Sequence, residues 1–316
     1  MGIARAFDNV AELVAAPDVD LVAVTVRVPH HYDIVKTVIS AGKHVYCEWP
    51  LGNGLAQAEE LARLAGVAGV LGVVGTQARF APEIIYLRQL IEDGYVGEIL
   101  SSTLVARGMG WGGSVPVEKT GAYLLDRANG ATMLTIPFGH TMAAVRDVLG
   151  EIAELAALLA VRRKKAVALD TGAVLSVTAP DQVLVSGLLE RGAPFSVHYR
   201  GGAPRNGVGL VWEINGTEGD IRVTGSSGHS QLAHLSLSGG RGEDRALQPL
   251  EVPGSLLAGW PDDPVPGNVA RIYGRLAADL RDGSRTAPSF DDAVAIHKVI
   301  AAMEEAAASG GRIALT

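Results

Sequence analysis

The chain has 316 residues, of which 48% are hydrophobic and 19% charged, so it is long enough for two domains and does not have a disordered composition. Its formal net charge of -7, from 27 Lys and Arg against 34 Asp and Glu, argues against a general nucleic-acid-binding surface. No stretch reaches the roughly 18 unbroken apolar residues of a membrane-spanning helix. These properties predict a cytoplasmic protein with no nucleic-acid or membrane partner.

The single cysteine and the one basic cluster are both predicted to be structural. Cys47 excludes an internal disulfide framework and fits a reducing cytoplasm. Because it lies inside an apolar run, it is predicted to be a buried, unreactive thiol. The basic cluster, Arg162 to Lys165, predicts a solvated strand end or turn rather than a phosphate-binding patch.

The first 78 residues alternate between segments typical of helices and segments typical of buried strands. Asp8 is a candidate cap for an amphipathic helix that ends at Pro17. Strands are predicted over 21–28, 44–49 and 70–76, with helices over 32–42 and 55–69 between them. This alternation with short connections predicts a parallel sheet, the second half of a doubly wound, Rossmann-like domain.

After Arg79 the pattern changes. Helices are predicted in 81–98 (ending at Gly94), 135–149, 268–282 and 290–309. From Ala153 to Val252 strand-like segments dominate, separated by turn signals such as Asn215-Gly216. The expected fold is therefore a partial α/β sheet followed by a mainly antiparallel α+β domain with flanking helices.

Four blocks of this sequence resemble one protein family in order and spacing: AGKHVYCEWPL, VVGTQARFAPEIIYLRQLIEDGYVGEI, NGATMLTIPFGHTMAAVRDVLG and WEINGTEGDIRV. They are similar to the GFO/IDH/MocA family of sugar-type oxidoreductases over nearly the whole chain. Glu48-Trp49-Pro50 and the LTIPFGH segment resemble the branch that contains the yeast galactose-regulon repressor, a dinucleotide-binding protein without redox chemistry.

The resemblance implies a dinucleotide-binding domain over 1–78 and a substrate-binding and dimerisation domain over 79–316, closed by a helix at 290–309. It implies NAD or NADP as cofactor, a carbohydrate-like small-molecule substrate, and a homodimer or dimer of dimers. The family's first βαβ unit, with its G-x-G-x-x-G turn, is absent from this chain. Either the start is incomplete, or the half-sheet is natively missing and a dimer hides the deficit.

The resemblance also places cofactor contacts at the ends of the predicted strands. Val26, Arg27 and Val28 match the turn that lines the nicotinamide half of the cofactor, and Arg27 is either a phosphate contact or an exposed loop residue. His31 matches a histidine at the start of the next helix, where a structural hydrogen bond is expected. Glu48 matches a glutamate that faces the nicotinamide ribose; the alternative is a carboxylate held by backbone donors.

Two positions depart from the family's acid/base pair. Trp49 stands where the family has lysine, and an indole cannot exchange protons at neutral pH. It is expected either to stack on a nicotinamide or sugar or to pack in the core. His140 matches the family's histidine, but Ile136 stands where an aspartate would orient it. His140 remains a candidate catalytic and substrate-binding residue because its unperturbed pKa lies near neutral pH.

Other candidates lie in the Gly-rich segment 108–130, and one, Arg79, lies earlier in the chain. Tyr123 and Lys119 are candidate replacements for the missing proton donor. Trp111 is a candidate substrate contact, because the family's corresponding segment skirts the pocket. Arg79 matches an arginine near the pocket and is expected to hold a substrate hydroxyl or carboxylate. No metal site is expected.

Three functions are consistent with these residues. The first is an NAD(P)-dependent oxidoreductase acting on a sugar or polyol, because the cofactor itself carries hydride chemistry. The second is a non-catalytic regulatory protein that senses a dinucleotide or sugar. The third is a redox-neutral enzyme on the same scaffold.

Overall fold

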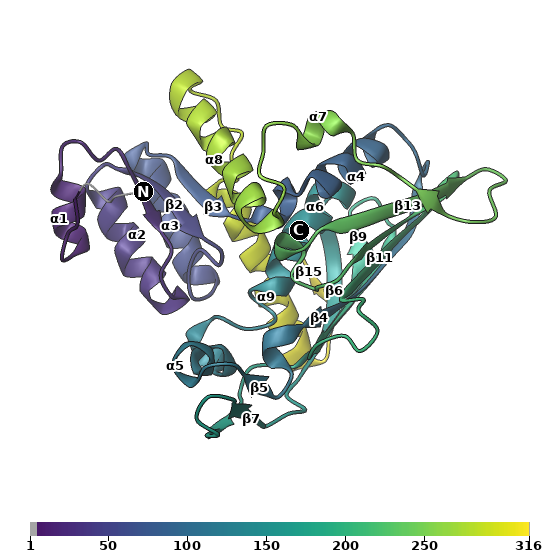
Figure 1. Ribbon diagram of the computed structural model, residues 1–316, viewed down its shortest axis with the longest axis horizontal. Coiled ribbons are helices and arrows are strands. Elements are labelled where there is room, and N and C mark those ends of the chain that lie inside the picture. The colour runs from purple at the N-terminus through teal and green to yellow at the C-terminus, as the bar shows by residue number, and fades with distance from the viewer. Residues whose placement is uncertain (1–4, 316) are drawn as a thin grey trace.

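The N-terminal part of the protein is a three-stranded parallel sheet (Figure 1), seen in a computed structural model that describes residues 5–315. Its strands pair in the order β1 (Leu21–Val24), β2 (His44–Glu48) and β3 (Gly72–Gly75). The helices of this part are α1 (Val10–Ala15), α2 (His31–Ser40) and α3 (Leu55–Ala68). The Rossmann-like parallel sheet expected from the sequence is thus confirmed.

Local chemistry explains where these elements begin and end. The cap of α1 is Asn9 and not Asp8, since the Asn9 side chain accepts a hydrogen bond from the Glu12 N–H at 2.9 Å. Strand β1 ends at Val24, short of the predicted Val28, because the chain turns into a short 3-10 helix, η1 (Val28–His30), with Pro29 in its first turn.

Both faces of the small sheet are covered. Val35, Val38 and Leu61 of α2 and α3 are fully buried in one hydrophobic cluster with Cys47 of β2. On the other face Tyr46 packs with residues of α8 (Pro264–Asp282). Cys47 is completely buried, and desolvation raises the pKa of its thiol, as expected of an unreactive cysteine.

The second sheet has nine strands, in the order β14-β13-β12-β11-β4-β10-β9-β6-β15. Only β4 and β10 pair in parallel; the other neighbours are antiparallel, which confirms a mainly antiparallel sheet. The strands are β4 (Ile99–Gly108), β6 (Ile152–Ala160), β9 (Gln182–Leu189), β10 (Pro194–Gly201), β11 (Leu210–Gly216), β12 (Gly219–Gly225), β13 (Leu235–Arg241), β14 (Gln248–Pro249) and β15 (Ile313–Ala314).

Three helices cover one face of this sheet (Figure 1): α4 (Pro82–Glu92), α6 (Pro137–Leu149) and α9 (Phe290–Ser309). α6 lies against β10, where the Phe138 and Tyr199 rings meet edge to face with centroids 5.8 Å apart. α9 begins at a capping box formed by Ser289 and Asp292, and it spans the residues predicted for the closing helix. α9 also packs against α3, so one hydrophobic core joins the two sheets.

The segment between β4 and α6 and the hairpin after β6 form a third, small sheet, which the sequence analysis did not foresee. It pairs β5 (Ser114–Val115) with β7 (Lys165–Ala168), and β7 with β8 (Val174–Ser176).

The remaining short elements are α5 (Glu118–Gly121), α7 (Gly254–Leu257) and the 3-10 helices η2 (Gln77–Phe80), η3 (Met109–Trp111), η4 (Ala122–Leu125), η5 (Arg127–Asn129) and η6 (Ser230–Leu232). Arg162 to Lys165 lie at the turn into β7, as predicted. Within residues 5–315, no helix is both long and apolar enough to cross a membrane.

Candidate functional site

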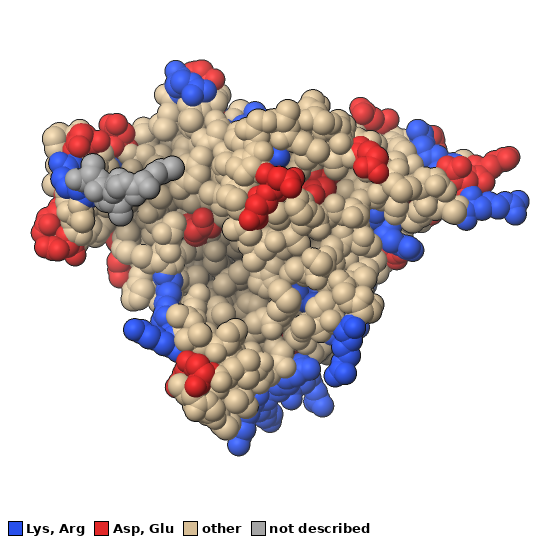
Figure 2. All heavy atoms as spheres, viewed as in Figure 1, with Lys and Arg blue, Asp and Glu red and all other residues tan. Residues whose placement is uncertain are grey.

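The carboxyl ends of β1, β2 and β3 lie along one edge of the small sheet, because all three strands are parallel. In such sheets ligands bind at this edge. Figure 2 shows a hollow in the surface between the N-terminal part and the side of the large sheet, above α5. The polar side chains at or just after the ends of these strands are Arg27, Glu48 and Gln77.

Glu48 is held by side chains rather than by backbone donors. The Tyr46 hydroxyl donates to its Oε1 at 3.0 Å, and the Gln77 amide donates to its Oε2 at 2.6 Å. Burial raises the pKa of Glu48, and these two hydrogen bonds oppose that rise. Gly75 permits the close approach, since a Cβ there would lie 2.7 Å from Oε2 of Glu48. The result is a fixed carboxylate at the end of β2.

Trp49 is a packing residue. It is 5% exposed, and its indole N–H donates to the Thr135 carbonyl oxygen at 2.6 Å. Its ring lies 4.7 Å from the His297 ring, and a Cβ on Gly139 would collide with it at 2.6 Å from Nε1. Of the two roles expected for Trp49, stacking on a ligand or packing in the core, this geometry fits the second: the ring is enclosed between α6 and α9.

His140 lies on α6 and is 4% exposed, and its Nδ1 has no hydrogen-bond partner among residues 5–315. Burial, together with the neighbouring His229, lowers the pKa of His140 to about 3. The pKa in the folded protein thus lies well below the ordinary value of a histidine. The imidazole is therefore neutral at pH 7 and is a weak base.

His229, which the sequence analysis missed, completes this part of the site. Burial lowers its pKa to about 4, and its ring stacks on Trp111 at 6.2 Å. Trp111 is 3% exposed and its N–H donates to the Leu124 carbonyl oxygen at 2.9 Å, so the predicted substrate contact is mostly enclosed. His229 lies in SSGHSQ, which carries no recognisable motif, so only the fold brings it to His140.

Arg27 joins the end of β1 to the segment after β5. Its guanidinium lies 4.7 Å from the centre of the Tyr123 ring and donates to the Lys119 carbonyl oxygen at 2.8 Å. Burial raises the pKa of the Tyr123 hydroxyl, partly offset by Arg27, so this phenol stays protonated. The side chain of Lys119 is exposed. The structure brings the three residues together, although only Arg27 and Tyr123 contact each other through side chains.

His31 has a structural role, as expected. It is 1% exposed, and its two ring nitrogens lie 2.8 Å from the carbonyl oxygens of Pro50 and Val26. The ring therefore holds the ends of β1 and β2 together. Val28 is buried and Val26 is exposed beside it.

Arg79 faces helices and not a pocket, so its predicted role in substrate binding is corrected. Its Nε donates to Asp147 of α6 at 2.7 Å, and its Nη1 lies 3.3 Å from Asp292 of α9. The side chain is only 17% exposed. Arg79 ties η2 to two helices of the core.

Replacing Arg79 with leucine is expected to lower the free energy of unfolding by about 3 kcal/mol, since Asp292 loses its cation and Asp147 keeps only the more distant Arg88 at 3.9 Å. Urea unfolding measures the loss. Arg312→Leu, which breaks an exposed pair with Glu154, serves as control and is expected to cost less than about 1 kcal/mol. Unchanged stability of Arg79→Leu, with weaker ligand binding, would contradict this role.

Two family profiles match the chain in succession. Residues 1–76 match the oxidoreductase family with an NAD-binding Rossmann fold. Residues 82–225 match the C-terminal domain of Gal80p. The break between them falls where η2 leads from the small sheet to α4.

Individual relatives include both regulators and a dehydrogenase. The galactose/lactose metabolism regulatory protein GAL80 of Kluyveromyces lactis is 30% identical over 74% of this chain and 54% of its own length. The dehydrogenase aclE of Aspergillus oryzae is 30% identical over 71% of this chain and 62% of its own length. The crystal structure of the transcriptional regulator Gal80p from Kluyveromyces lactis superposes with a TM-score of 0.86 at 26% identity, covering 98% of this chain and 80% of that one.

These findings correct the expectation about partners. That expectation named a small-molecule substrate and a second copy of the chain, and it excluded any connection to nucleic acid. The Kluyveromyces lactis protein is described both as a regulator of galactose and lactose metabolism and as a transcriptional regulator, so the absence of a basic surface was too narrow a basis for that exclusion. The chain covers only part of the length of the two curated relatives: 54% of the GAL80 protein and 62% of the dehydrogenase. Taken together, the two successive profile matches and the shared fold show that the chain belongs to the GFO/IDH/MocA oxidoreductase family, in the branch that resembles the yeast Gal80 regulators.

Proposed function

We propose that the protein binds a nicotinamide dinucleotide and acts as a regulatory protein, passing the bound state on to a protein partner. The observation that carries this proposal is the packing of Trp49. The residue that stands where family resemblance places a proton-transferring lysine is 5% exposed and fixed by a hydrogen bond to Thr135. A side chain in this position cannot exchange a proton with a substrate.

The residues at the strand ends fit the nicotinamide-ribose half of such a cofactor. Glu48 presents a fixed carboxylate, which suits the hydroxyls of a ribose. Arg27, which follows β1, is an exposed cation held against Tyr123 and is suited to a phosphate. When bound, the cofactor supplies or accepts a hydride. The chain's own residues would bind and orient it.

The other candidate proton donors support a non-catalytic role. The pKa of His140 is lowered to about 3, so it does not become cationic near neutral pH. The pKa of Tyr123 is raised by burial, so its hydroxyl can donate a hydrogen bond but is a poor general base. Lys119 is exposed and its ammonium has no ion pair among residues 5–315. Proton transfer contributes about 10²- to 10⁴-fold to a rate, so its loss is costly.

The second candidate is a slow NAD- or NADP-dependent oxidoreductase acting on a sugar or polyol. The dehydrogenase relative at 30% identity favours it, and so does the retained Glu48. In this case Trp49 and Ile136 replace the usual lysine and aspartate, and Tyr123, Lys119 or His140 supplies the proton.

Three further properties belong to this proposal. The chain divides into a dinucleotide-binding unit, 1–78, and a second unit, 79–316, each with its own sheet.

Copies of the chain associate through the open face of the large sheet, where Leu158 and Leu184 are 57% and 37% exposed. The protein works in the cytoplasm, which suits its single unpaired cysteine.

Titration with NADH and with NADPH, followed by fluorescence, tests the binding step. We expect saturable binding in the micromolar range, weakened about tenfold by Glu48→Gln, because the variant loses the ionised acceptor of a ribose hydroxyl. Glu60→Gln, on the surface of α3, is the matched control and should bind as the wild type does. No binding below millimolar concentration would contradict the proposal.

A further inference from the structure

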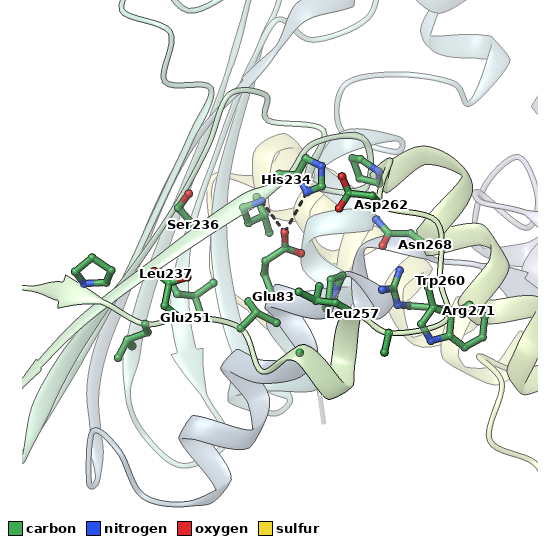
Figure 3. A pocket seen from close by; sticks show the side chains of 18 of the residues that line it. Glu83, His234, Ser236, Leu237, Glu251, Leu257, Trp260, Asp262, Asn268 and Arg271 are labelled. Carbon is green, nitrogen blue, oxygen red and sulfur yellow. Dashed lines mark hydrogen bonds and ion pairs between the residues drawn. The ribbon is translucent and has the colours of Figure 1, made fainter.

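A cavity of about 880 Å³ lies apart from the strand-end site, between β13, the first turn of α4 and the segment from Glu251 to Arg271 (Figure 3). Its volume is in the range of small-molecule sites, roughly 300 to 1,000 Å³. Leucines of β13 and of α7 form apolar parts of its wall. Neither the family match nor the proposed function assigns anything to it.

Glu83 provides the first polar group of the cavity. It is 7% exposed, and its Oε1 accepts a hydrogen bond from the Leu235 N–H at 3.2 Å and lies 3.6 Å from Nδ1 of His234. Figure 3 shows the carboxylate directed toward β13. Its second oxygen has no hydrogen-bond partner among residues 5–315. This oxygen is therefore open to the cavity, where a ligand hydroxyl could donate a hydrogen bond to it.

Helix α8 provides the opposite wall. Asn268 is fully buried, and its amide nitrogen donates to the Gln231 carbonyl oxygen at 3.2 Å, whereas its Oδ1 has no partner within residues 5–315. One turn further along, Arg271 is 7% exposed and donates from Nη2 to the Leu256 carbonyl oxygen at 3.2 Å. Its guanidinium also lies 5.5 Å from the centre of the Trp260 ring, and its other N–H groups have no hydrogen-bond partner among residues 5–315, so they can donate to a ligand.

The chemistry of these groups selects the class of ligand. Glu83 and Arg271 carry opposite charges, so the inner part of the cavity is close to neutral, and the carboxylates of Glu251 and Asp262 lie in exposed positions. Unused acceptors and unused donors stand together, which suits hydroxyl groups, because each hydroxyl both donates and accepts. Trp260, 39% exposed, offers an aromatic surface at the rim for the C–H groups of a sugar ring.

We propose that this cavity binds a neutral polyhydroxylated small molecule of monosaccharide size. The ligand's hydroxyls bond to Glu83, Asn268 and Arg271, and one of its faces lies against Trp260. One connection between this cavity and the His140 side of the candidate dinucleotide site runs through η6. Ser230 on η6 bonds to Thr141 of α6 at 2.9 Å, and the next residue, Gln231, accepts from Asn268. Binding here does not depend on the proposed function.

Isothermal titration of the full chain with D-galactose, D-xylose and the diamine putrescine tests the proposal. At least one sugar is expected to bind saturably at concentrations up to roughly 100 mM, the weak end of measurable affinity. Glu83→Gln is expected to weaken that binding about tenfold, since a charged acceptor is lost. Trp260→Ala is a second variant at the exposed rim, expected to fold even if Glu83→Gln does not. Glu243→Gln, exposed and outside the cavity, is the matched control and should bind as the wild type does.

Three results would overturn the proposal. The first is that neither sugar binds. The second is that putrescine binds and the sugars do not, which would assign the cavity to a cation. The third is sugar binding that survives both Glu83→Gln and Trp260→Ala but is lost in Glu48→Gln, which would place the sugar at the strand-end site. If NADH does not bind, only the proposed function is contradicted, and the sugar-binding results keep their meaning. The proposed function and the sugar-binding proposal can therefore fail separately.

Discussion

Replacing Trp49 with alanine is expected to lower the free energy of unfolding by about 4 kcal/mol, the usual cost of emptying a buried tryptophan site. The indole fills the space between α6 and α9, where it contacts the His297 ring and the backbone of Gly139. Its loss also leaves the Thr135 carbonyl oxygen without the N–H donor that lies 2.6 Å away. Urea unfolding followed by circular dichroism measures the change.

Two further variants separate packing from other effects. Trp49→Phe keeps most of the ring but not the N–H, and is expected to cost about 1 to 2 kcal/mol. Trp260→Ala removes a tryptophan that is 39% exposed and is expected to cost at most about 1 kcal/mol. Equal stability of Trp49→Ala and wild type would show that the ring is not part of the core, and would restore it as a ligand contact.

Acidification is expected to destabilise the protein steeply between about pH 6.5 and pH 4. Burial lowers the pKa of three histidines: His140 to about 3, and His229 and His297 to about 4 each. Their ordinary pKa in the unfolded chain is about 6.5. Below that pH the three histidines are protonated in the unfolded chain but stay neutral in the folded protein. The free energy of unfolding that is present at neutral pH is therefore lost as the pH falls.

The size of this loss follows from linkage. Each such histidine contributes a slope of about 1.4 kcal/mol per pH unit, so three contribute about 4 kcal/mol per unit within the window. Across the window this amounts to a loss of up to about 10 kcal/mol, comparable with a typical total stability of roughly 5 to 15 kcal/mol. Urea titrations at several pH values measure the slope, and His140→Gln should reduce it by about one third, since one of three equal contributions is lost. A stability that is flat between about pH 6 and pH 5 would contradict the burial of these rings.

Local patterns in the sequence were enough to predict the two main sheets and the helices that cover them, but not the small third sheet. The apolar runs that became β1 to β3 and the helical periodicity of α9 are short-range signals, and each element formed close to the predicted residues. Gln77 could also have been found, because a polar residue directly after a buried parallel strand faces the edge where ligands bind. Sequence resemblance located Glu48 and His140 but said nothing of their surroundings.

The properties of the site depended on contacts that the sequence does not display. Trp49 and Thr135 are 86 residues apart, and Arg79 and Asp147 are 68 residues apart. The pairing of His140 with His229 needs the whole large sheet to be in place. Whether a tryptophan stacks on a ligand, or an arginine binds a substrate, depends on what fills the space around it, and that is fixed only by tertiary packing.

The most direct test of the account is to ask whether the protein binds NADH without using it. Full-length protein is mixed with NAD⁺ and a panel of sugars and polyols, and the appearance of NADH is followed by its absorbance, beside a fluorescence titration of the same sample. Saturable NADH binding without turnover is predicted, and Trp49→Lys, if it folds, is the variant in which turnover would first appear. Turnover by the wild type at an ordinary enzyme rate, about 1 s⁻¹ or faster, would contradict the claim that proton transfer has been lost.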